Sequence, residues 1–145
     1  MKIQINKKST IYFVGIGGIG MSGIALIMKN LGYNVCGSDL TSSNKVIEEI
    51  KKNKVKIVKG HESKSILKAD IVVISTAIKP DNKEFRLAKK SNKLIIKRAD
   101  MLAHLINLKK NIIISGSHGK TTITSLVSHL LLSLIHISEP TRPLY

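Results

Sequence analysis

The chain has 145 residues, of which 43% are hydrophobic and only 3% aromatic, so it should form about one domain around an aliphatic core. Its formal net charge of +15 would suit a nucleic-acid binder, but the lysines are spread over every segment without a basic stripe, so we expect no nucleic-acid partner. The single cysteine, Cys36, excludes an internal disulfide and is typical of a reducing cytoplasm. No apolar run reaches the roughly 18 residues of a membrane span, and the N-terminus is typical of a strand rather than a signal peptide.

Short β-branched runs alternate with helix-like stretches along the whole chain. Ile11–Gly15 predicts a strand, and the apolar spacing that starts at Met21 predicts a helix with Gly32 at its C-terminal end. The remaining expected elements are strands at 34–39, 54–60, 70–76, 93–98 and 111–116, and helices at 44–53, 63–68, 81–91, 99–108 and from 119 onward.

This alternation predicts an α/β fold with a doubly wound, mostly parallel, Rossmann-like sheet. The run 70–76 carries almost no polar side chain, as expected for a strand that is buried on both faces. Ligands of such folds bind at the carboxyl ends of the strands, so the loops that follow the strands are where a site is expected.

The first of these loops contains G-x-G-x-x-G as Gly15, Gly17 and Gly20, between a strand and a helix. An acidic residue, Asp39, ends the next strand about 20 residues later, which completes the dinucleotide-binding pattern. Glycine lets the backbone approach a pyrophosphate, and the helix N-terminus favours its charge. Taken alone, this loop favours an NAD(P)-dependent oxidoreductase, although it indicates a diphosphate site without identifying the diphosphate.

A second glycine loop, Gly116–Thr122, reads GSHGKTT. It lacks the longer spacer of the common phosphate loop, since Ile114 stands where that pattern has its first glycine. Backbone N–H groups around Gly119 can still hold phosphate oxygens, Lys120 can neutralise the β- and γ-phosphates, and the Thr121 hydroxyl can ligate Mg²⁺. Two different phosphate loops in one chain favour an enzyme that binds a diphosphate-bearing substrate and also consumes ATP.

That combination resembles the Mur ligases of bacterial cell-wall synthesis. The likeness runs from about Ile11 to Leu130 and is specific because its segments occur as an ordered set. Those segments are FVGIGGIGMSGIA, LGYNVCGSD, KGHES, VVISTAIKPDN, KRADMLAHL and SGSHGKTTITSLVSHLL.

The resemblance implies that the first glycine loop binds a UDP-sugar and not NAD. For the UDP-sugar site it implies Gly17, Gly18, Ile19, Gly20, Met21, Ser38, Asp39, His61, Ser75, Thr76, Ala77 and Ile78, to which we add Arg98 at the end of a predicted strand. For ATP it implies Gly116, Ser117, His118, Gly119, Lys120, Thr121 and Thr122, with Lys120 as the catalytic residue and Thr121 as the Mg²⁺ ligand.

The activity that the resemblance implies is ATP-dependent joining of L-alanine to UDP-N-acetylmuramate through an acyl phosphate, in the cytoplasm. A related ligase that attaches a preformed peptide to the same sugar, and the NAD(P)-dependent oxidoreductase, remain alternatives. The oligomeric state is not predicted. We expect residues 1–108 to form the UDP-sugar domain, and 109–131 to begin an ATP-binding domain that is truncated here, so the chain should not ligate alone. Residues 132–145 are expected to be a non-native tail, because LSLIHISEPTR resembles a translated transposase adapter of sequencing libraries.

Overall fold

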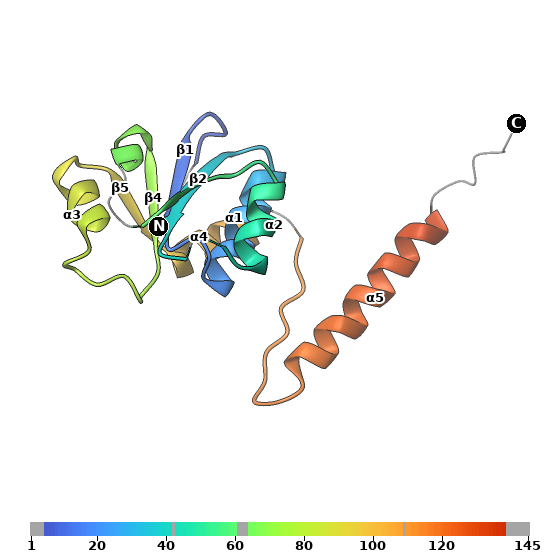
Figure 1. Cartoon of the computed structure of the whole chain (residues 1–145). Helices are drawn as coiled ribbons and strands as arrows, with labels where there is room; N and C mark the ends of the chain where they lie inside the picture. Colours follow the sequence, from blue (N-terminus) through green and yellow to red (C-terminus); the bar gives the residue numbers. More distant parts are fainter. Residues whose placement is uncertain (1–4, 42, 61–63, 109, 139–145) are drawn as a thin grey trace, which may run out of the picture. The chain divides into compact units, whose positions relative to one another are not determined.

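The computed structural model describes residues 5–41, 43–60, 64–108 and 110–138. The chain divides into two compact units, Met1–Lys109 and Lys110–Tyr145. The first unit contains the sheet and its covering helices, and the second contains one long helix (Figure 1).

The first unit is built on a five-stranded sheet in which every neighbouring pair is parallel. The strand order is β3-β2-β1-β4-β5. The chain first adds β2 and β3 on one side of β1 and then adds β4 and β5 on the other side, so the strand order reverses at β1. This arrangement confirms the predicted Rossmann-like α/β fold. The strands are β1 Thr10–Val14, β2 Asn34–Asp39, β3 Lys56–Lys59, β4 Ile71–Ile74 and β5 Leu94–Lys97, and the helices are α1 Ile19–Asn30, α2 Lys45–Lys52, the 3₁₀ helix η1 Lys64–Lys68, α3 Lys83–Lys90 and α4 Arg98–Leu108.

Two hydrophobic cores lie on opposite faces of this sheet. Ile11 and Phe13 of β1 pack with residues of α1, α2 and α4, whereas Tyr12 and Val14 pack with residues of η1 and α3. Figure 1 shows α1, α2 and α4 on one side of the sheet and α3 on the other. The predicted burial of the fourth strand is confirmed, since Ile71, Val72 and Val73 are all buried. Burial on both faces is why these strands read as continuous apolar runs.

The helix ends follow local sequence signals. Gly32 has a φ of 88° after α1, and the Tyr33 N–H donates to the Met28 carbonyl at 3.1 Å, which confirms the predicted glycine end of this helix. The side-chain oxygens of Asn44 and Asn82 accept from the third N–H beyond them, at 2.8 and 3.0 Å, and so cap α2 and α3.

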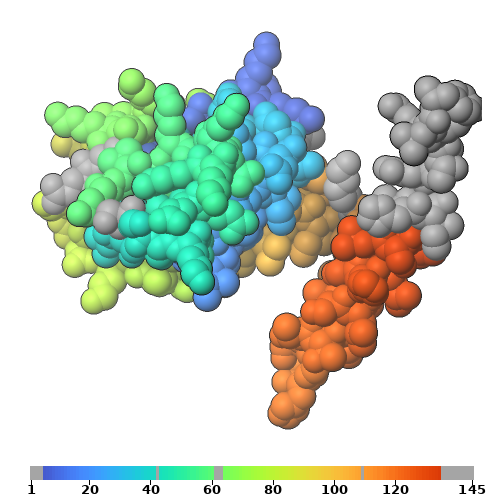
Figure 2. Space-filling model, turned by 45° about the vertical axis from the view of Figure 1, so that its right-hand side comes forward, coloured from blue at the N-terminus to red at the C-terminus, as the bar shows by residue number. Residues whose placement is uncertain are grey.

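In the second unit, helix α5 runs from Lys120 to Ser138, which confirms the helix expected from 119 onward. The predicted strand at 111–116 is wrong, because these residues form no strand and pair with none in the described chain. A strand needs a neighbour for its N–H and C=O groups, and this short unit supplies only a helix. The side chains of α5 up to residue 134, orange to red in Figure 2, are mostly exposed, including those of Leu126 and Leu130.

Among the residues that the structure describes, no helix combines the length and apolar character needed to cross a membrane.

Candidate diphosphate-binding site

A cavity of about 430 Å³ opens at the carboxyl ends of β1, β2 and β4, where the sheet reverses its strand order. Doubly wound folds bind ligands at such a switch point, and the volume lies within the range of small-molecule sites. Its walls come from the loops after these three strands and from the start of α4. The lining residues are Gly15, Gly17, Gly18, Ile19, Gly20, Met21, Asp39, Thr41, Asn44, Ser75, Thr76, Ala77, Ile78 and Arg98.

The glycine loop after β1 is held in one conformation by backbone hydrogen bonds. Gly15 has a φ of 74°, a region that glycine occupies without strain. The N–H groups of Gly15 and Ile16 both donate to the Ser38 carbonyl, at 2.8 and 2.9 Å. Gly18 then caps α1, and its carbonyl accepts from the N–H groups of Met21 and Ser22 at 2.9 and 2.8 Å. The N–H groups of Ile19 and Gly20 precede these first hydrogen bonds, so the positive end of α1 favours an anion there.

The Asp39 carboxylate lies under this loop rather than projecting freely from the end of β2. Its Oδ2 accepts from the Gly17 N–H at 2.7 Å, and its Oδ1 accepts from the Thr41 N–H at 2.9 Å. A Cβ on Gly17 would lie 2.8 Å from Oδ2 and equally close to Ile47, so a larger residue there would displace the Asp39 carboxylate or the Ile47 side chain. Asp39 therefore fixes the loop that forms the cavity floor.

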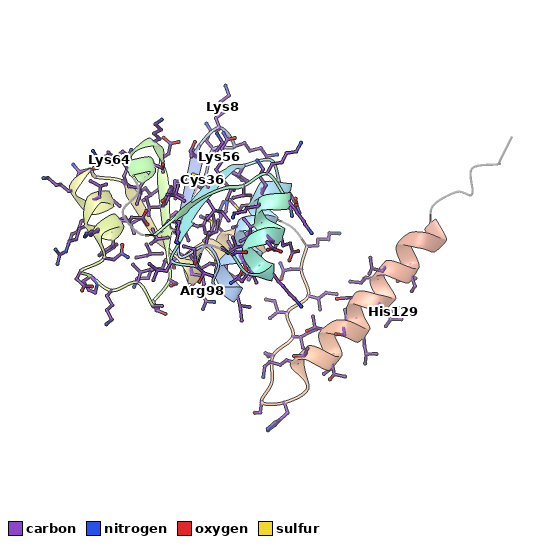
Figure 3. All side chains as sticks on the ribbon, viewed as in Figure 1. Lys8, Cys36, Lys56, Lys64, Arg98 and His129 are labelled. Carbon is purple, nitrogen blue, oxygen red and sulfur yellow. The ribbon has the colours of Figure 1, made fainter. Side chains whose placement is uncertain are left out.

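Arg98 supplies the cationic group of the cavity. It is the first residue of α4, and a Cβ on Gly20 would overlap its guanidinium. The guanidinium thus lies against the first turn of α1 and lines the cavity; Arg98 is labelled in Figure 3. A permanently charged fork beside a helix N-terminus is well suited to an oxyanion such as a diphosphate.

The other wall is the turn after β4, Ser75–Ile78, closed by the Ile78 N–H donating to the Ser75 carbonyl at 3.1 Å. One residue expected at this site, Ser38, is not among those that line it. The Ser38 side chain is fully buried and donates to Glu84 instead, so only its carbonyl serves the glycine loop. His61 lies outside the described residues.

Sequence reasoning missed three residues that shape this region. Thr41 and Asn44 line the cavity from the loop after β2, and the only available signal was that Asn44 precedes an amphipathic helix as a cap would. Glu84 is 1% exposed and accepts hydrogen bonds from Tyr12 and Ser38. Nothing in the charged stretch KEFRLAKK distinguishes this buried glutamate from a solvated one.

The second glycine loop lies in the second unit and immediately precedes α5. Gly116 and Gly119 have φ values of 154° and 75°, so both positions favour glycine. The Lys120 ammonium donates to the carbonyls of Gly116 and Ser117 at 2.7 and 3.1 Å, while Thr121 and Thr122 follow in the first helical turn. The seven residues predicted for ATP therefore form one continuous loop and helix start. In the described residues no three His, Cys, Asp or Glu side chains gather as a metal site.

The parallel sheet with a glycine-lined cavity at its switch point defines a Rossmann-like unit, and that cavity is where nucleotides bind in such folds. A family model described as "Mur ligase family, catalytic domain" matches residues 10–110, and the chain belongs to this family.

The chain is 56% identical over 130 residues to the UDP-N-acetylmuramate–L-alanine ligase of Pelagibacter ubique, which covers 90% of this chain and 28% of that protein. Its structure is similar to the UDP-N-acetylmuramate–alanine ligase of Thermotoga maritima, with a TM-score of 0.79, 31% identity, and coverage of 87% of this chain and 30% of that one. It is also similar to a murein peptide ligase of Psychrobacter arcticus, with a TM-score of 0.76, 25% identity, and coverage of 85% and 26%. The chain thus spans less than a third of the length of these relatives.

Proposed function

We propose that this chain is the substrate-binding part of a cytoplasmic, ATP-dependent ligase that joins L-alanine to UDP-N-acetylmuramate in peptidoglycan precursor synthesis. The observation that carries the proposal is the cavity in which the α1 N-terminus and the Arg98 guanidinium meet. The separate Gly116–Thr122 loop supports it, because a simple dehydrogenase has no use for a second phosphate loop. The name carried by the relative that is 56% identical supports the choice of substrates.

In this proposal the UDP-sugar places its diphosphate over the start of α1. The glycine loop Gly17–Met21 surrounds the diphosphate, whose charge is neutralised by the N-terminus of α1 and the Arg98 guanidinium, while the Ser75–Ile78 turn closes the opposite wall. Asp39 holds the loop through Gly17 and lies within reach of the nucleoside. His61 keeps its predicted role in the nucleotide pocket, and Ser38 contributes through its carbonyl.

The residues of the second loop fit ATP and Mg²⁺. The Lys120 ammonium contacts two loop carbonyls, so it lies where phosphate oxygens can replace them, and the Thr121 hydroxyl is in the first turn of α5. Bound ATP with Mg²⁺ would supply the phosphoryl group that activates the sugar's carboxylate as an acyl phosphate. Lys120 would then stabilise charge on that group as the catalytic residue.

The proposed organisation assigns residues 1–108 to the UDP-sugar domain and 109–131 to the beginning of an ATP-binding domain, with 132–145 as a non-native tail. The division of the structure near Lys109 supports the first boundary. Because the chain spans less than a third of the length of the ligases that it resembles, we expect no ligation by this chain alone.

Calorimetric titration of the 145-residue chain separates the proposed substrate from a nicotinamide cofactor. We expect saturable binding of UDP-N-acetylmuramate, weaker binding of UDP, and no heat with NAD or NADP. Binding of NAD or NADP without a response to the UDP-sugar would identify an oxidoreductase and overturn the proposal.

The second candidate is a ligase that attaches a preformed peptide to the same sugar, which the similarity to the murein peptide ligase favours. The higher identity to the alanine ligase of known structure, 31% against 25%, supports L-alanine as the acceptor. Phosphate release by the protein encoded by the full gene decides between them. Stimulation by L-alanine supports the first proposal, and stimulation by a peptide alone supports the second.

A further inference from the structure

A buried carboxylate lies next to the cavity without lining it. Glu84, in the first turn of α3, is 1% exposed, although the charged residues that flank it, Lys83 and Arg86, are exposed. The Tyr12 hydroxyl donates to its Oε1 at 2.7 Å, and the Ser38 hydroxyl donates to its Oε2. Each carboxylate oxygen therefore accepts from a different strand, Tyr12 being in β1 and Ser38 in β2.

Ser38 connects this carboxylate to the glycine loop. While its hydroxyl bonds to Glu84, its carbonyl accepts from the N–H groups of Gly15 and Ile16. The next residue, Asp39, accepts from Gly17. The last two residues of β2 thus hold three successive N–H groups of the loop, and Glu84 restrains the first of these two residues from the opposite side of the sheet from α1.

Glu84 also restrains the other wall of the cavity. Its helix, α3, follows the Ser75–Ile78 turn and is capped by Asn82, so the position of α3 limits where that turn can lie. One side chain therefore connects the helix behind one wall to the strand that holds the other. Two acceptor oxygens on one rigid group are needed for this, and a carboxylate has them.

We propose that Glu84 is a positioning residue that sets the spacing of the glycine loop and the Ser75–Ile78 turn, and thereby the affinity for the diphosphate of the substrate. This inference rests on the proposed UDP-sugar function. It assigns to Glu84 no contact with the ligand.

The test compares Glu84→Leu, Glu84→Gln and Ser38→Ala with Ala88→Gly as the matched control. Ala88 is fully buried in the same helix and the same core, so its change weakens α3 while keeping Glu84 and both of its hydrogen-bond donors, Tyr12 and Ser38. Binding of UDP-N-acetylmuramate is measured by calorimetry well below each variant's Tm. Exchange of the Gly15 and Ile16 amides is measured by NMR without ligand.

We expect Glu84→Leu and Ser38→Ala each to raise Kd about tenfold, and their combination to add little, because both break the same chain of hydrogen bonds. Glu84→Gln keeps one acceptor oxygen and should have a smaller effect. Ala88→Gly should lower Tm and leave Kd unchanged. The Gly15 and Ile16 amides should exchange faster in Glu84→Leu and Ser38→Ala, while the Val72 and Val73 amides of β4 remain protected.

An unchanged Kd in Ser38→Ala, or an equal rise of Kd in Ala88→Gly, would overturn the proposal. If Glu84→Leu does not fold, Ser38→Ala and Glu84→Gln decide it. If the unaltered chain does not bind UDP-N-acetylmuramate, the proposed function fails, but the amide exchange still shows whether Glu84 holds the loop. Unchanged exchange at Gly15 and Ile16 would overturn the inference by itself.

Discussion

At the scale of single residues, the Arg98 guanidinium occupies the space that a side chain at Gly20 would need. Replacing Gly20 with alanine improves helix propensity by about 1 kcal/mol, but the new methyl group overlaps the Arg98 guanidinium and displaces it. We therefore expect Gly20→Ala to keep or raise the free energy of unfolding while it weakens UDP-N-acetylmuramate binding about tenfold, the effect of losing one charge-assisted contact. Calorimetry and urea unfolding measure the two effects separately.

Gly23→Ala is the control for this prediction. It lies in the same helix, and a Cβ there would meet nothing within 4 Å. It should stabilise the chain by a similar increment and leave binding unchanged. Equal binding by both alanine variants would show that the Arg98 position does not matter to the ligand.

Cys36 offers a second prediction at this scale. Burial raises the pKa of its thiol above the usual value, and the positive charge of Lys56 opposes part of that rise. The two residues are register partners on β2 and β3 and are labelled near each other in Figure 3. Because the thiolate is the reactive form, iodoacetamide should modify native Cys36 several-fold more slowly than a free thiol at pH 8, and denaturant should restore the rate.

Lys56→Gln removes the opposing charge, so the pKa of the Cys36 thiol should rise further and its alkylation should become slower still. Glu48→Gln, a change at an exposed helix position, is the control and should leave the rate unaltered. Faster alkylation in Lys56→Gln would contradict the electrostatic explanation.

At the scale of elements, the ends of α2 and α3 differ in how well their residues suit the backbone. Lys54 and Asn92 follow these helices with φ values of 58° and 49°, where glycine is favoured and asparagine is tolerated better than lysine. Relief of this strain is partly offset by the greater freedom of glycine in the unfolded chain. Lys54→Gly should therefore raise the free energy of unfolding by about 0.5–1 kcal/mol, and Asn92→Gly by less, as measured by urea unfolding. A loss of stability in Lys54→Gly would contradict this explanation.

The elements also show how far the sequence predicts the structure. The strands and helices of the first unit follow from periodicity and caps, because each signal is local and agrees with the parallel sheet. The stretch 111–116 has the composition of a buried strand but forms none, since strand formation depends on a neighbour that composition does not report.

The candidate site divides in the same way. Its glycine loop and the turn at Ser75–Ile78 were predictable, because each follows a recognisable strand. The buried Glu84 and the burial of the Ser38 hydroxyl depend on how α3 packs against β1 and β2. Contacts between side chains that are distant in the sequence cannot be recognised from local sequence patterns.

At the scale of the whole molecule, the two units differ in how they dispose of apolar surface. The first has two cores, whereas α5 exposes Leu126, Leu130 and Leu134 by about 60% each. Large exposed apolar surface promotes association. We expect the 145-residue chain to self-associate with rising concentration, and residues 1–109 to be monomeric with unchanged affinity for UDP-N-acetylmuramate, as measured by light scattering and calorimetry.

A variant of the full chain with Leu126 and Leu130 changed to glutamine tests the cause. It should lose the association and keep the affinity. Association that persists in residues 1–109 would place the associating surface on the first unit.

The strand order has a consequence for the time at which the cavity can form. The residues that line it extend from Gly15 to Arg98 in the sequence. Because β2 and β3 precede β4 in the chain, β4 can pair with β1 only after both of these strands have been synthesised. During synthesis the glycine loop therefore leaves the ribosome long before its guanidinium partner does. A nascent chain that ends before Arg98 has the glycine loop but lacks the guanidinium that lies against it. Affinity for the diphosphate should therefore rise abruptly once the first residues of α4 have been added, and not gradually with chain length.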